Sequence, residues 1–157
     1  MMKQALISRK YLINIILALV AIGTMVFYSV CTTSCSYLKG NILGVDLKYV
    51  GIIYMAALIA LSATKKDLLL LILLSAGIGV EIFLVAFQVK NDVYCPFCLT
   101  FGVILVLLFL LNMNPGRKWL MAICIALGFL SFLLLFRGSA TPNYSFTLNC
   151  VSFRHRI

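Results

Sequence analysis

The chain has 157 residues, of which 64% are hydrophobic, and its mean hydropathy is +1.13. Soluble domains of this size are about 45–50% apolar, so the composition excludes an ordinary soluble domain and predicts an integral membrane protein with one domain. The net charge of +9 does not indicate nucleic-acid binding, because no basic patch is interleaved with solvent-facing aromatic residues. The basic residues are better explained as topology signals.

Five apolar runs are candidates to cross a bilayer, whose core needs about 20 apolar residues. The runs are continuous, which favours helices over the alternating strands of a membrane barrel. The expected fold class is therefore all-α, an integral membrane helical bundle with short connections between antiparallel neighbours. The expected spans are Tyr11–Val30, Tyr49–Thr64, Leu68–Val89, Phe97–Leu111 and Trp119–Phe136. The first is expected to be retained, because no small-x-small cleavage site precedes Cys31.

The segment Ser36–Lys48 is the only sizeable loop before the tail, and its apolar residues fall at helix-like spacing. We expect a short amphipathic helix here that lies at the membrane interface and caps the bundle. Residues 1–137 would form the bundle, and residues 138–157 would form a short polar C-terminal tail.

Lysine and arginine predict the orientation. The segment before the first span and the loops after the second and fourth spans would lie on one side of the membrane. They carry Lys3, Arg9, Lys10, Lys65, Lys66, Arg117 and Lys118, whereas the short loops on the opposite side carry only Lys39, Lys48 and Lys90. Cytoplasmic segments are the richer in basic residues, so the first set is expected inside and the loops that hold the cysteine pairs outside. The tail would also lie outside, against the charge rule.

Four of the six cysteines form two pairs at the ends of spans, Cys31-Thr-Thr-Ser-Cys35 and Cys95-Pro-Phe-Cys98. Both pairs are expected on one oxidising membrane face, which favours disulfide chemistry. A pair on a loop and a pair at a helix start permit thiol–disulfide exchange. The alternatives are a four-thiolate zinc site and inert bridges that staple loops. We favour exchange and assign no metal.

The second pair opens the fourth span. With Cys95 near the N-cap, Pro96 suits the first helical position, where its missing N–H costs nothing. Cys98 then falls in the first turn, where the macrodipole and the helix-end N–H groups favour a thiolate. Such a thiol is well placed to give electrons to a lipid-soluble acceptor. Cys124 is expected to pack as a small hydrophobe, and Cys150 is assigned no role.

Glu81 is the only acidic residue deep within a span. An intramembrane carboxylate is costly and is by default a functional candidate, and a protonated structural acid that faces the bundle is the alternative. Asn14, Thr24 and Gln88 are expected to pack between helices.

The loop pair, the run Gly44-Val-Asp-Leu-Lys-Tyr-Val-Gly51-Ile-Ile-Tyr54 and the later CxxC resemble the vitamin K epoxide reductase family, including its bacterial disulfide-forming branch. The resemblance covers about Val30 to Leu111. It implies a four-helix core around a quinone, a fifth helix outside that core, and a periplasmic thioredoxin-like partner at a bacterial inner membrane.

Carried over by position, Cys31 would exchange with the partner and Cys35 would relay electrons to Cys95. Cys98 would then reduce ubiquinone or menaquinone. The candidate quinone contacts are Cys98, Phe101, Tyr54 and Glu81.

The expected function is a membrane quinone reductase that reoxidises a periplasmic thioredoxin-like thiol oxidase and so drives disulfide formation. One alternative is reduction of vitamin K quinone or its epoxide, although Val45–Thr64 lacks the Asn with which mammalian members hold vitamin K. Another is a non-enzymatic membrane scaffold stapled by disulfides. A thiol carrier that moves reducing equivalents across the membrane would need cysteines in opposing spans, whereas both pairs here share one face.

Overall fold

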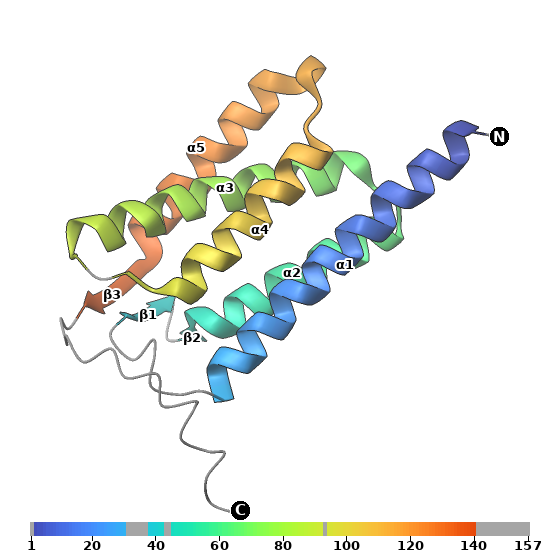
Figure 1. The fold of residues 1–157 in the computed structure, drawn as a ribbon. Helices are drawn as coiled ribbons and strands as arrows, with labels where there is room; N and C mark the ends of the chain where they lie inside the picture. Colours follow the sequence, from blue (N-terminus) through green and yellow to red (C-terminus); the bar gives the residue numbers. More distant parts are fainter. Residues whose placement is uncertain (1, 31–37, 43–44, 93, 141–157) are drawn as a thin grey trace, which may run out of the picture.

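The computed structural model describes residues 2–30, 38–42, 45–92 and 94–140. In this part of the chain five α-helices follow one another, and a single 3-10 turn, Pro115–Arg117, precedes the last of them (Figure 1). The helices are α1 (Met2–Val30), α2 (Leu47–Ala63), α3 (Asp67–Lys90), α4 (Pro96–Asn112) and α5 (Lys118–Leu135). All five predicted spans are confirmed as helices. Only the observed bounds of α1 differ from the predicted ones by more than a few residues, because the helix continues into the polar sequence before Tyr11.

Among the described residues, three segments are long and apolar enough to cross a membrane: Arg9–Phe27 in α1, the whole of α3, and Pro115–Leu135, which contains α5. The helices α2 and α4 are apolar but shorter. The chain is therefore built as a membrane protein, and its many exposed apolar side chains are suited to contact with lipid.

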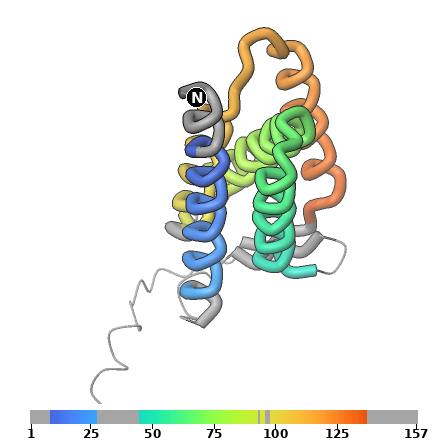
Figure 2. The backbone as a smooth tube through the Cα atoms, turned by 90° about the vertical axis from the view of Figure 1, so that its right-hand side faces the viewer, coloured from blue at the N-terminus to red at the C-terminus, as the bar shows by residue number. Residues whose placement is uncertain are grey.

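The most extensive helix packing joins α3 to α5, which are not consecutive in the sequence. α1 contacts α2 and α4, and α3 contacts α2, α4 and α5. Seen from the side, α1 and α5 lie at opposite edges of the bundle (Figure 2). The buried core between the helices is apolar, and its largest members come from α2, α3 and α4, including Met55, Leu74 and Leu105.

Two polar contacts join the helices at the end opposite to the start of α4. The buried amides of Asn14 and Asn112 exchange hydrogen bonds of 3.1 and 2.9 Å between α1 and α4. The Tyr11 hydroxyl donates to Asp67 Oδ1 at 2.8 Å and joins α1 to α3. Paired amides satisfy each other where lipid offers no partner, so the prediction that Asn14 packs between helices is confirmed.

The prediction of an amphipathic helix over Ser36–Lys48 is wrong. The described residues of this segment form strand β1 (Leu38–Ile42) and the short strand β2 (Val45–Asp46), and α2 begins at Leu47. β1 pairs antiparallel with β2 and with β3 (Phe136–Ala140), which gives the sheet order β2-β1-β3. The sheet lies at the end of the bundle where α4 starts (Figure 1).

Strand β3 also crosses the boundary expected between bundle and tail. Its residues pair from Leu38 opposite Ala140 to Ile42 opposite Phe136, so residues 138–140 belong to the sheet. The rest of the predicted tail, from residue 141 onward, lies outside the described residues.

α5 approaches α3 at two glycines. A Cβ atom added at Gly79 would collide with the backbone of Ile125 and Phe129, and one added at Gly128 would collide with the backbone of Ala76. Close backbone approach at small residues is a common means of packing helices in membranes. Towards the sheet the same interface is filled by aromatic rings, with Phe83 packed edge-on against Phe129, Phe132 and Phe136.

We expect Gly128→Ala to lower the free energy of unfolding by about 1–3 kcal/mol, the usual cost of forcing extra volume into a packed site. The obstacle is backbone of α3, which cannot rotate away as a side chain can. The measurement is the unfolding midpoint in detergent micelles. Gly23→Ala is the matched control, because beyond its own helical surroundings no atom of the described residues lies within 4 Å of a Cβ placed there, and alanine is the better helix former. Equal midpoints for the two variants would contradict the tight α3–α5 contact.

Candidate functional site

The start of α4 has the geometry that its sequence predicts. Cys95 is the N-cap residue in an extended conformation, Pro96 occupies the first helical position, and Cys98 lies in the first turn. The Leu99 N–H donates to the Cys95 carbonyl at 3.1 Å, which closes that turn. The Cys95 N–H in turn donates to Gln88 Oε1 at 3.0 Å, so a side chain of α3 holds the N-cap of α4.

The described cysteines differ in their bonding. Cys95 is disulfide-bonded, whereas Cys98 and Cys124 are buried free thiols. The Cys95-Pro-Phe-Cys98 pair is therefore not closed on itself. Cys31 and Cys35 lie outside the described residues. The predicted exchange between this loop pair and Cys95, and the alternative of a zinc site, therefore stay predictions.

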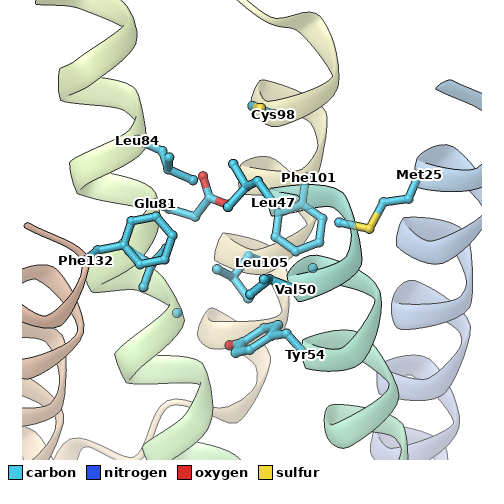
Figure 3. Close-up of a pocket in the computed structure, with 13 residues that line it drawn as sticks. Met25, Leu47, Val50, Tyr54, Glu81, Leu84, Cys98, Phe101, Leu105 and Phe132 are labelled. Atoms are coloured by element: carbon cyan, nitrogen blue, oxygen red, sulfur yellow. The ribbon is translucent and has the colours of Figure 1, made fainter. Parts of the chain in front are cut away.

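Cys98 lines a cavity of about 110 Å³ enclosed by side chains from all five helices (Figure 3). The three other residues predicted to contact a quinone, Phe101, Tyr54 and Glu81, line this same cavity. Cys98, Phe101 and Leu105 reach it from successive turns of α4. The remaining lining is almost entirely apolar, from Met25, Leu47, Val50, Gly51, Gly77, Val80, Leu84 and Phe132.

Three glycines around the cavity leave room for the side chains that shape it. At Gly51 a Cβ would collide with the Met25 side chain, and at Gly77 it would collide with the ring and hydroxyl of Tyr54. At Gly102, one turn after Cys98, it would come within 3.0 Å of Glu81 Oε2. The carboxyl group of α3 therefore packs directly against the α4 backbone near Cys98.

The polar groups of the cavity are few. The Tyr54 hydroxyl donates to the Leu73 carbonyl at 2.9 Å. Glu81 is 6% exposed, and its Oε2 is a buried atom without a hydrogen-bond partner. Burying a polar atom without a hydrogen-bond partner destabilises a protein by about 1–3 kcal/mol. An atom of this kind in a native structure therefore calls for an explanation, such as a catalytic role.

Gln88 belongs to this site although the sequence analysis placed it among the packing residues. It is 1% exposed, its Oε1 accepts from Cys95, and its Nε2 has no partner. The signal that could have found it is helical spacing. Glu81, Leu84 and Gln88 follow one face of α3 at intervals of three and four residues, and that face leads from the cavity to the CxxC.

The arrangement can hold a flat apolar ring beside a thiol. An apolar protein cavity of about 150 Å³ binds benzene, so a space of about 110 Å³ is on the scale of one six-membered ring. Aromatic faces from Phe101 and Phe132, and the Cys98 sulfur, line it. Comparison with known proteins gives no match, since no protein-family model, no curated protein and no solved structure corresponds to this chain.

Proposed function

We propose that this chain is a membrane thiol:quinone oxidoreductase that draws electrons from a thioredoxin-like thiol oxidase and so drives disulfide formation. One observation carries the proposal: the free thiol of Cys98 opens into an apolar cavity while its neighbour in the CxxC, Cys95, is disulfide-bonded. A CxxC closed on itself as an inert bridge would leave no free thiol at the cavity, whereas Cys98 is free. The resemblance to the bacterial branch of the vitamin K epoxide reductase family supports the same conclusion.

The electron count of this reaction balances. Oxidising two thiols to one disulfide releases two electrons and two protons, and converting a quinone to a quinol takes up the same number. Electrons would enter at Cys31 and Cys35, open the disulfide at Cys95, and leave through Cys98. The quinone would be the substrate of the last step, and a cavity on the scale of one six-membered ring supports this role. Its chain would extend between helices towards lipid.

The proposed orientation places the cysteines on the periplasmic side of a bacterial inner membrane. Lys10 and Arg117 line one polar pocket together with Asp67. Asp67 begins α3, at the end of the bundle opposite to the start of α4 (Figure 1). Lys65 and Lys66 precede α3 at the same end. Basic residues concentrate on the cytoplasmic side of membrane proteins, so this end would face the cytoplasm.

The direct test uses sealed membrane vesicles of known sidedness with a reduced thioredoxin-like protein added outside. Right-side-out vesicles that contain the protein should oxidise the added dithiol, with one quinone reduced for each dithiol consumed. Inverted vesicles should be inactive until they are permeabilised. Absence of quinone reduction in both kinds of vesicle, before and after permeabilisation, would favour the stapled scaffold. Activity confined to inverted vesicles would reverse the orientation.

A further inference from the structure

Glu81 combines three features that packing alone does not explain. It is the only glutamate in the 157-residue sequence. It lies in the middle of α3, 6% exposed, with its Oε2 unpartnered. Its side chain faces the same cavity as the Cys98 sulfur (Figure 3). A structural acid would be expected to hold a hydrogen bond at each buried oxygen.

A second observation concerns which unpaired polar atoms of α3 reach the cavity. In the described part of the chain, two buried side-chain atoms lack a hydrogen-bond partner, Glu81 Oε2 and Gln88 Nε2. Both belong to α3 and are two helical turns apart on one face. Of the two, Glu81 lines the cavity, whereas Gln88 contacts Cys95 beside it, so the unpaired polar atom that faces the cavity itself is Glu81 Oε2, and such an atom calls for a functional explanation.

Among the described residues, the other titratable groups that line the cavity are Tyr54 and Cys98. The Tyr54 hydroxyl proton is held by the Leu73 carbonyl, and Cys98 is the electron donor. The other described residues of the lining carry no charged side chain. Glu81 is thus the one described residue at the cavity whose oxygen is available to give or take a proton.

We propose that Glu81 is the proton donor for quinone reduction at this cavity, an inference that rests on the proposed function. The carboxyl group gives its proton from Oε2 to a quinone oxygen as Cys98 and Cys95 lose two electrons and form their disulfide. The proton of the Cys98 thiol restores the carboxyl group, and the proton of the Cys95 thiol supplies the second O–H bond. Two S–H bonds break, one S–S and two O–H bonds form, and Glu81 ends as it began.

The first test needs no variant. Because Glu81 is the sole glutamate, protein labelled with carboxyl-¹³C glutamate carries a single isotopic probe, read by difference infrared spectroscopy in lipid. We expect a labelled carboxylic-acid band in the resting protein that changes on addition of a quinone analogue and again on reduction. A labelled band characteristic of a carboxylate in every state, or a carboxylic-acid band that never changes, would overturn the proposal.

The second test compares Glu81→Gln with Ser75→Ala. Ser75 is a buried polar residue of the same helix whose hydroxyl bonds to the Leu71 carbonyl, away from the cavity. We expect Glu81→Gln to bind quinone with unchanged affinity and to slow single-turnover reduction by about 10²–10⁴-fold, the usual contribution of a general acid. The residual rate should also lose the wild-type decline at high pH, where the carboxyl group would be ionised. Ser75→Ala should match the wild type.

The outcomes separate the two proposals. Wild-type protein that reduces no quinone would remove the proposed function and this inference together. Wild-type activity with an equally active Glu81→Gln would overturn the proton role alone. Loss of quinone binding in Glu81→Gln would make Glu81 a binding group and would equally overturn the proton role.

Discussion

Cys98→Ser is expected to slow quinone reduction to the uncatalysed background rate. The Cys98 sulfur is the only one in the described part of the chain that lines the cavity as a free thiol, and a serine oxygen cannot take part in thiol–disulfide exchange. The measurement is quinone absorbance with a reduced thioredoxin-like donor. The same variant should still trap the donor as a mixed disulfide through Cys31, because that step precedes the one that is removed.

Cys124→Ser is the matched control for this experiment. Cys124 is also a buried free thiol, but it belongs to α5 and is not part of the cavity lining. The control should therefore reduce quinone at the wild-type rate, apart from any loss of folded protein. A Cys98→Ser protein with wild-type turnover would refute the assignment of Cys98 as the residue that passes electrons to quinone.

The double variant Cys31→Ala/Cys98→Ala is expected to accumulate a disulfide between Cys35 and Cys95 under mild oxidation. Cys31→Ala removes the thiol that would resolve this bridge from the loop side, and Cys98→Ala removes the one that would open it from the helix side. Cys95 is disulfide-bonded while Cys98 is free, so the helix pair already shows the asymmetry that a relay needs. The measurement is mass spectrometry of the linked peptides.

A double variant that carries Cys31→Ala with Cys124→Ala controls for the loss of two cysteines, and it should not accumulate the bridge because Cys98 remains. Wild-type protein that holds only fixed Cys31–Cys35 and Cys95–Cys98 bridges, unresponsive to donor or quinone, would instead indicate that the cysteines staple the loops. The experiment thus asks whether the two pairs exchange electrons at all.

The helices could be predicted from the sequence because their signal is local. Continuous apolar runs and turn residues such as Pro115 place α2 to α5 within a few residues of their observed ends. The sheet could not be predicted in this way. Leu38 and Ile42 match a helical period, yet they form a strand because β3 offers a ladder from the far end of the chain. Strand formation depends on such partners more than on local preference.

The candidate site was predicted unevenly for a similar reason. Proline after the N-cap gives the position of Cys98 directly, and Glu81 was found as the only acidic residue deep within a span. Tyr54 and Phe101 were candidates beside them. The cavity between them depends on where Gly51, Gly77 and Gly102 let side chains meet across helices. Gln88 was assigned to packing because its contact with the backbone N–H of Cys95 is not visible in the sequence, and only its helical spacing from Glu81 connects it with the site.

The pairing of β1 with β3 has a consequence for biosynthesis. At synthesis rates of roughly 5–20 residues per second, the roughly one hundred residues between these strands take on the order of 5–20 seconds to emerge. During that time β1 (Leu38–Ile42) cannot pair with β3, because β3 (Phe136–Ala140) follows α5 in the chain. The segment that joins the loop cysteines to α2 would thus complete its strand pairing only after the last helix has entered the membrane. A ribosome that stalls within α5 would leave a nascent chain whose helices are inserted but whose thiols remain open to mispairing.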